Sequence, residues 1–383
     1  MAQHVREIFI EDTDDSESRR IAVRNARYYH DDLAELSDED VSFFDELMKT
    51  HGLQPVVRRM DKEKSGLLWS DLNGIMALLL LCMSPKAHTA TLDMVNKWDL
   101  APFRAQPLVQ PAAFPNLRSL TLTKRRGLSF FLDQLAPLLH AAPGIEDLSL
   151  TQCDGVSMPL NLSRLRTATF KSCMLGYRDL RRLLDRSTEL ETFVSKEDGR
   201  RGGGTAFWQA YPAQVIEVLH PATASLKHID IDLSRAHADF WEKMGYRVSP
   251  IEADTGGNAN LDQSRARRAS RLRRVKKAAL PTLETLAINI TAIEPGDGNA
   301  LVDLIENCPL LRQLVICQVN RFKQLEDSLQ RLGEQVAGGR FPELTRVEVH
   351  FGNFRAITNN HEIETFDALK ALFADGGVQL HSL

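Results

Sequence analysis

One short pattern of apolar residues returns eight times along this chain. It consists of an apolar residue, a second one three positions later and a third one two positions after that. The clearest copies are Leu117/Leu120/Leu122, Ile145/Leu148/Leu150, Leu283/Leu286/Ile288 and Leu311/Leu314/Ile316. The step from Leu117 to Ile145 has the same length as the step from Leu283 to Leu311. A fixed period of this length indicates a chain built from stacked, similar units.

The spacing of the third apolar residue favours a strand over a helix. On a helix it would lie about 140° around from the first and leave the shared face, whereas in a strand the second and third residues of the pattern point the same way. Weaker copies are Val5/Ile8/Ile10, Leu226/Ile229/Ile231, Leu344/Val347/Val349, Leu165/Ala168/Phe170 and the incomplete pair Leu190/Phe193. Each copy therefore predicts a short strand.

Helices are predicted between these strands. Several copies follow a proline that cannot continue a helix, in Phe114-Pro115, Ala142-Pro143, Cys308-Pro309 and Phe341-Pro342. The preceding segments have helical spacing at Leu128/Phe131/Leu132/Leu135/Leu139, with Pro137 as an interruption, and at Leu180/Leu183/Leu184, Leu301/Leu304/Ile305 and Leu325/Leu329/Leu332/Val336. The predicted fold class is α/β: a leucine-rich repeat solenoid, a curved horseshoe with parallel strands on the concave face and helices on the convex face.

The period and the distribution of charge divide the chain into four segments. Residues 1–64 form an N-terminal cap with a first strand and an acidic helical segment, since residues 1–50 carry fourteen acidic and six basic side chains. Leucine-rich repeats follow over 65–234 and again over 280–383. Between them, Leu226 and Leu283 lie about twice as far apart in sequence as Leu283 and Leu311. This doubled step predicts a polar and basic insertion over 235–279 that is partly disordered.

Eight basic residues gather near the end of this insertion. They are Arg265, Arg267, Arg268, Arg271, Arg273, Arg274, Lys276 and Lys277. A solvated insertion explains them without any partner; a nuclear-import signal and a direct contact with nucleic acid are the alternatives. The absence of aromatic residues between Gly256 and Leu280 argues against base stacking, and nucleic acid is therefore the less favoured partner.

The sequence carries no pattern typical of a catalytic, cofactor or metal site. The run Gly202-Gly203-Gly204 lacks the lysine and hydroxyl residue of a phosphate-binding loop, and neither His-Glu-x-x-His nor Gly-x-Ser-x-Gly occurs. We expect no enzyme activity, no cofactor and no metal. The five cysteines show no paired spacing and are expected to be reduced, mostly buried thiols of an intracellular protein, cytoplasmic or nuclear. The apolar run Gly74 to Met83 is about half the length of a membrane span, and we expect a buried helix and no membrane contact.

The order of the motifs resembles the degenerate leucine-rich repeat region of filamentous-fungal F-box-type proteins. The resemblance rests on the apolar run that begins at Gly74 and on the segments 114–120, 226–233, 280–286 and 341–347. It implies a substrate-recognition subunit in which an F-box would hold a Skp-type adaptor of a cullin ubiquitin ligase and the repeats would capture the target. This chain departs from that plan, because its only Leu-Pro pair, Leu280-Pro281, lies inside the repeats and Val5 to Ile10 already has the pattern of a repeat strand.

The predicted function is that of a non-catalytic scaffold for protein–protein interaction; the alternative is a nuclear protein that contacts nucleic acid through 265–277. In a strand whose leucines point into the core, the intervening side chains face the other side of the sheet. The predicted protein-binding residues on the concave face are Ser119, Thr121, Asp147, Ser149, Lys171, Asp230, Asp232, Thr285, Asn289, Arg346, Glu348 and His350. A sheet face that is merely solvated is the alternative interpretation of the same residues.

Overall fold

The computed structural model describes residues 7–10, 46, 50, 86–93, 114–123, 130–196, 212–232, 279–289, 298–319, 322–351 and 360–383. The chain forms two compact units, Met1–Arg164 and Leu165–Leu383. Both have α/β structure with parallel strands. Four sequence-based predictions lie outside the described residues: the acidic helix apart from Glu46, the apolar helix over 74–83, the disorder of the insertion and the role of its basic segment.

Strands of the N-terminal unit pair in the order in which they occur along the chain. The unit contains β1 (Glu7–Ile10), β2 (Thr89–Asp93), β3 (Ser119–Thr123) and β5 (Asp147–Thr151), all parallel. A second, short sheet pairs β4 (Phe130–Phe131) with β6 (Cys153–Gly155). The 3-10 helix η4 (Leu132–Leu135) is followed by α4 (Ala136–Ala141), which has Pro137 in its first turn. The predicted helix is therefore interrupted where proline removes a backbone donor.

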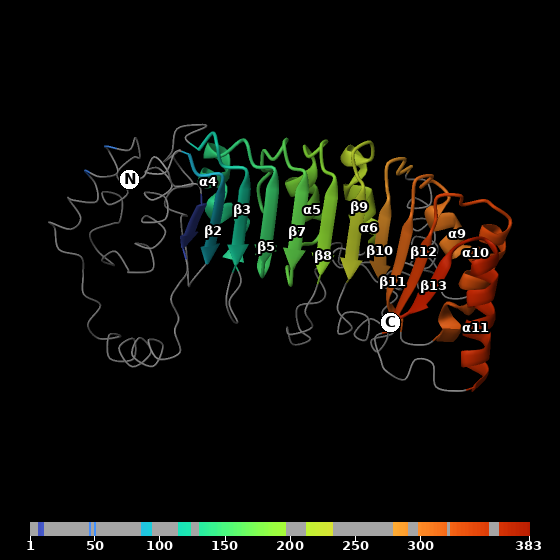
Figure 1. Ribbon diagram of the computed structural model, residues 1–383. Coiled ribbons are helices and arrows are strands. Elements are labelled where there is room, and N and C mark those ends of the chain that lie inside the picture. The colour runs from blue at the N-terminus through green and yellow to red at the C-terminus, as the bar shows by residue number, and fades with distance from the viewer. Residues whose placement is uncertain are drawn as a thin grey trace, which may run out of the picture. The chain divides into compact units, whose positions relative to one another are not determined.

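The C-terminal unit repeats the same order with more strands. Its parallel strands are β7 (Thr167–Lys171), β8 (Thr192–Lys196), β9 (His228–Asp232), β10 (Thr285–Asn289), β11 (Gln313–Val319), β12 (Arg346–Phe351) and β13 (Gln379–Ser382). Each of them pairs with the next, and their arrows point the same way in Figure 1.

Helices and 3-10 turns lie between these strands in sequence. They are α5 (Tyr177–Leu184), α6 (Pro212–Val218), η6 (His220–Ala222), α9 (Ala300–Ile305), η8 (Phe322–Gln324), α10 (Glu326–Ala337) and α11 (Asn360–Asp375). Helix α5 packs beside α6, and α10 contacts both α9 and α11. Successive helices thus pack on one another, as successive strands pair.

The core is built from the apolar pattern in register. Leu120 lies opposite Leu148, and Leu286 lies opposite both Ile229 and Leu314. Each of these five side chains is at most 1% exposed. Because equivalent residues of neighbouring strands lie side by side, each repeat completes the burial of the apolar side chains of the repeat before it. The predicted burial of Leu120, Leu148, Leu286 and Leu314 is confirmed.

Proline precedes several strands because a tight turn opens the repeat there. The amide of the first buried residue donates to a carbonyl three residues earlier, as in Leu117 N to Phe114 O (3.3 Å), Ile145 N to Ala142 O (3.4 Å), Leu283 N to Leu280 O (3.2 Å), Leu311 N to Cys308 O (3.1 Å) and Leu344 N to Phe341 O (3.2 Å). In all five turns the second residue is proline, whose fixed φ suits that position.

The backbone enters each strand through one recurring contact. The carbonyl of Arg118 accepts hydrogen bonds from the amides of Glu146 (2.7 Å) and Asp147 (2.9 Å). In the same way, the carbonyl of His88 accepts hydrogen bonds from the amides of Arg118 (2.8 Å) and Ser119 (3.0 Å). His88 therefore marks a further copy of the pattern. Its buried residues are Ala87, Ala90 and Leu92, and the two alanines hid this copy from the sequence analysis.

The predicted insertion separates two strands that pair directly. Thr285 lies opposite His228, and Leu286 lies opposite Ile229, although the step between their repeats is about twice the usual one. Strands β9 and β10 are therefore direct neighbours in the order of the sheet. The strands of the C-terminal unit on either side of the predicted insertion thus pair directly. The boundary between the two compact units follows Arg164.

Candidate protein-binding face

Side chains that alternate with the buried leucines form a second, polar side of each sheet. We call the predicted set, Ser119, Thr121, Asp147, Ser149, Lys171, Asp230, Asp232, Thr285, Asn289, Arg346, Glu348 and His350, the polar face. All twelve lie within strands. In β3, β5, β7 and β9 these residues are exposed or half-buried while their neighbours along the strand are buried, which is the alternation that a strand imposes.

In the N-terminal unit the polar face consists mainly of hydroxyl groups. Thr121 lies between Thr91 and Ser149 on the neighbouring strands, and Ser119 lies between Thr89 and Asp147. All six of these side chains are at least partly exposed, and Asp147 alone among them is charged. Threonine and serine here supply short donors and acceptors at the spacing of the strands.

In the C-terminal unit the polar face is charged. Lys171 lies opposite Lys196, and the ammonium group of Lys196 is 2.6 Å from the carboxylate of Asp230 on the next strand. This hydrogen bond raises the pKa of Lys196, and burial only partly opposes it. Asp230 is the more enclosed partner, with 15% of its side chain exposed against 49% for Lys196. The pair therefore offers a positive group to solvent.

A buried carboxylate organises the polar side of β12. Glu348, whose side chain is 7% exposed, accepts a hydrogen bond from Gln313 (2.8 Å) and pairs with Arg346 (2.5 Å) and His350 (2.9 Å). Burial alone would raise the pKa of Glu348, but these three partners outweigh it and the pKa is lowered. Arg346 and His350 remain 47% and 40% exposed, so Glu348 holds two cationic or protonatable groups at the surface.

Beside these charges lies a small buried cluster of Ala287, Val315 and Cys317. Burial raises the pKa of Cys317 to about 12, with the nearby carboxylates of Asp232 and Asp230 adding to the effect. Burial likewise raises the pKa of Cys308 to about 12. Both thiols are therefore protonated at neutral pH and poor nucleophiles.

The other two described cysteines have equivalent places in two repeats. Cys153 follows Gln152 (φ 63°) and Cys173 follows Ser172 (φ 51°), and each of these left-handed residues comes directly after a strand. Both sulfur atoms donate to a backbone carbonyl two residues away. The predicted burial of the thiols is confirmed for Cys153, Cys173, Cys308 and Cys317; Cys82 lies outside the described residues.

Two of the predicted binding residues are closed to solvent. Asn289 is 0% exposed and Glu348 is 5% exposed. Glu348 is enclosed by its three polar partners, and Asn289 lies opposite Cys317, which is itself buried. Their place in the strands is as predicted, but neither is available to a partner.

Sequence reasoning missed Lys196 and Gln313, which contact Asp230 and Glu348. Lys196 lies in the copy that starts at Leu190, where Ser195 takes the third apolar place, so its strand was only half recognised. Gln313 immediately precedes a clear apolar residue, Leu314, and the alternation alone could have placed it on the polar face.

The described part of the chain places no group of three or more His, Cys, Asp or Glu residues where they could hold a metal ion. Within the same residues, no helix combines the length and the apolar character needed to cross a bilayer. What the polar face can offer is reversible hydrogen bonding and ion pairing to another surface.

The chain matches no known protein-family model, and a search of curated proteins found no significant match.

Proposed function

We propose that this protein is a non-catalytic interaction scaffold of the leucine-rich repeat type, and that it captures a protein partner on its polar face. The observation that carries the proposal is the alternation along β3, β5, β7 and β9. Buried apolar side chains at alternate positions of these strands form the core, and the intervening positions hold partly or fully exposed polar side chains, which stand in register between β3 and β5. A repeat protein uses such an extended surface for binding.

The charged groups of the C-terminal unit suit recognition of a polar protein surface. Lys171 and Lys196 are adjacent on β7 and β8, and Arg346 and His350 stand over a buried acid on β12. Groups held by ion pairs and hydrogen bonds present their charges in fixed places, which favours specificity. The resemblance to F-box-type proteins suggests that the partner is a target of a cullin-type ubiquitin ligase, with binding to a Skp-type adaptor a separate question because no F-box pattern was found.

A charge swap tests the polar face without removing an ion pair. The double variant Lys196→Asp with Asp230→Lys keeps one acid and one base at the place of the 2.6 Å pair but reverses the local field. Parent and variant would be tagged, captured from the native organism and compared by quantitative mass spectrometry, with Skp-type adaptors as a named target. We expect the swap to lower recovery of the specific partner about tenfold or more, as expected for a charge contact worth about 1.5 kcal/mol or more, with an unchanged thermal midpoint.

Helix α11 supplies a matched control. Lys370 and Asp367 form an exposed ion pair with a distance of 2.9 Å, and exchanging these two residues alters charge outside the strands. Equal recovery by the strand swap and the helix swap would contradict the proposed binding face. Recovery of a Skp-type adaptor would support membership of a ubiquitin ligase.

The alternative function rests on the eight basic residues between Arg265 and Lys277. A contact with nucleic acid would weaken steeply as the salt concentration rises, because bound counterions are released from the phosphates. Recovery of nucleic acid that is lost between about 50 and 200 mM salt, and that survives the Lys196/Asp230 swap, would favour this alternative over the scaffold.

A further inference from the structure

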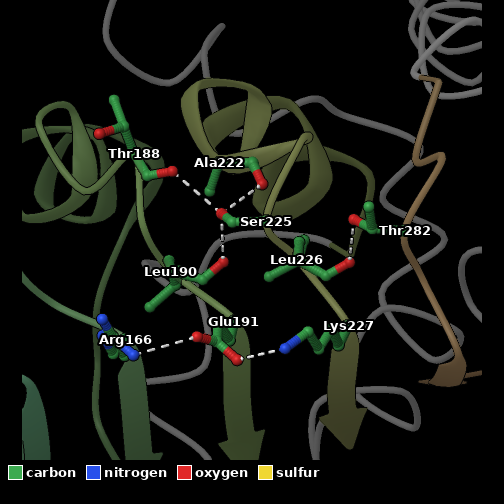
Figure 2. Close-up of polar contacts among 9 residues, drawn as sticks. All are labelled: Arg166, Thr188, Leu190, Glu191, Ala222, Ser225, Leu226, Lys227 and Thr282. Carbon is green, nitrogen blue, oxygen red and sulfur yellow. Dashed lines mark hydrogen bonds and ion pairs between the residues drawn. The ribbon is translucent and has the colours of Figure 1, made fainter.

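Charged residues at the start of neighbouring strands alternate in sign. The position concerned is the residue that follows the first buried residue of each repeat. From β7 to β11 it is occupied by Arg166, Glu191, Lys227, Glu284 and Arg312 in turn, and before β12 it is occupied by the uncharged Thr345. Figure 2 shows the first three in a row, with Glu191 in the middle.

Glu191 bridges the repeats on both sides of it. One carboxylate oxygen is 3.6 Å from Arg166, and the other is 2.6 Å from the ammonium group of Lys227. The hydrogen bond from Lys227 is the main cause of a lowered pKa for Glu191. In the N-terminal unit the same position holds Arg118 and Glu146, whose charged atoms are 3.6 Å apart.

Hydroxyl side chains two residues before Lys227 and Glu284 also join neighbouring repeats by hydrogen bonds. Ser225 donates to the carbonyl of Leu190 (2.9 Å), and Thr282 donates to the carbonyl of Leu226 (2.9 Å). Leu190 and Leu226 are the first buried residues of the repeats before them. Figure 2 shows that both hydroxyls reach back from the turn of one repeat to the strand entrance of its neighbour.

We infer that the charged position selects which repeat packs against which, and that the hydroxyls of Ser225 and Thr282 add a hydrogen bond at two of these joints. The backbone contacts at each strand entrance are alike: the carbonyls of Arg166, Glu191, Lys227 and Glu284 each accept two amides from the next strand. Similar backbones cannot distinguish one repeat from another. An acid between two bases can, because skipping one repeat places like charges together at the altered joint, as it would place Arg166 beside Lys227.

The test compares variants of the full chain that differ in how many like charges meet. Glu191→Lys brings a third positive charge between Arg166 and Lys227, whereas Glu191→Gln only removes the attraction. We expect a lower thermal midpoint for the lysine variant than for the glutamine variant. Hydrogen exchange of the amides of Lys227 and His228, which bond to the Glu191 carbonyl, should accelerate about two- to fivefold for each like-charge contact.

Complete inversion is the decisive variant. Changing all five residues, Arg166→Glu, Glu191→Lys, Lys227→Glu, Glu284→Lys and Arg312→Glu, restores the alternation with opposite signs and should bring the midpoint and the exchange rates back toward those of the parent. A five-residue variant as destabilised as Glu191→Lys would overturn the inference, as would equal midpoints for the Lys and Gln variants.

The salt dependence of the thermal midpoint provides a second test if the five-residue variant fails to fold. The difference between Glu191→Lys and the parent should shrink in 1 M salt, where the Debye length is about 3 Å. A difference in thermal midpoint that persists at this salt concentration would mean that packing, and not charge, causes the effect, and the inference would be wrong.

Discussion

At the scale of single residues, Glu348 is an acidic side chain that lies buried within the fold. A carboxylate whose side chain is 7% exposed must be compensated, and Gln313, Arg346 and His350 all contact it. The residue therefore stabilises the fold and positions surface groups at the same time. A change at Glu348 should affect both the stability of β12 and the arrangement of Arg346 and His350.

Replacing Glu348 with Gln should make the free energy of unfolding less sensitive to acidic pH. The folded pKa of Glu348 lies below its usual value of 4.5, so its charged form stabilises the native state at higher pH. That contribution is complete above a pH of about 4.5 and is lost as the pH falls through the lowered folded value. At pH 7 the variant should unfold with a free energy about 1.5 to 3 kcal/mol lower than that of the parent, and the difference should narrow below pH 4.5. Urea unfolding at a series of pH values measures it.

Glu334 on α10 provides the control for this experiment. Its pKa is also lowered, chiefly by the hydrogen bond from Arg331, but its side chain is 42% exposed, so solvent screens the interaction. Glu334→Gln should leave the free energy of unfolding unchanged at every pH. If the gap between Glu348→Gln and the parent is constant from pH 7 to pH 3, or widens toward acid, the role assigned to the Glu348 carboxylate is incorrect.

At the scale of elements, the paired leucines of adjacent strands should carry most of the stability. Leu120→Ala, Leu148→Ala, Leu286→Ala and Leu314→Ala should each cost about 2 to 5 kcal/mol, because each change removes apolar contacts and leaves a cavity. Thr121→Ala and Thr285→Ala, one residue away on the opposite side of the same strands, should each cost about 0.5 kcal/mol or less. Chemical denaturation distinguishes the two groups. Costs below about 1 kcal/mol at all four leucines would show that the alternation has been assigned to the wrong side.

The elements also show what the sequence could and could not predict. Strands with leucine or isoleucine at all three places, such as β3, β5, β10 and β11, were predicted because the side chains themselves carry the spacing. Strand β2 was missed because Ala87 and Ala90 occupy two of these places, and alanine occurs in every class of structure. Strand β13 was missed because it has only one apolar residue of the pattern, Leu380. Its Ser382 lies opposite Val349 of β12, where the pattern would have an apolar residue.

The residues of the polar face could be predicted only as far as the alternation along a strand allows. The two-residue period of a strand determines which side chains point away from the core. The predicted residues lie at those positions. Which of them meet depends on neighbours that are distant in sequence. The ion pair of Lys196 with Asp230 joins two different repeats, and Asn289 lies opposite a residue of the next repeat. Neither can be read from a local pattern.

At the scale of the whole molecule, the chain tolerates an interruption between β9 and β10. Residues 254–277 contain the polar run and all eight clustered basic residues. Deleting 254–277 shortens the step from Leu226 to Leu283, which then still exceeds the step from Leu283 to Leu311. The deletion variant should keep the thermal midpoint of the parent, since Thr285 to Ile288 pair directly with His228 to Ile231.

Deleting 254–277 also separates the two functional proposals. A scaffold that binds through the polar face should recover its partner undiminished, and a protein that binds nucleic acid through the basic residues should lose that ligand. Calorimetry measures the midpoint, and the capture experiment measures the partner. A fall of the midpoint by more than about 4 °C, equivalent to roughly 1 to 2 kcal/mol in a unit of this size, would mean that the deleted residues contribute to the folded core.

The direct pairing of β9 with β10 makes the connection between these two strands a place where the chain can change in length. Strand order there is kept by the surfaces of the two repeats, and the covalent path between them can vary in length without shifting the register of Ile229 and Leu286. A gene could therefore acquire or shed a coding segment at this place, including one that encodes a separately folding module, and the encoded protein would retain the same row of strands. The joint is thus a place where new regulatory sequence can enter the protein while Thr285 to Ile288 keep their pairing with His228 to Ile231.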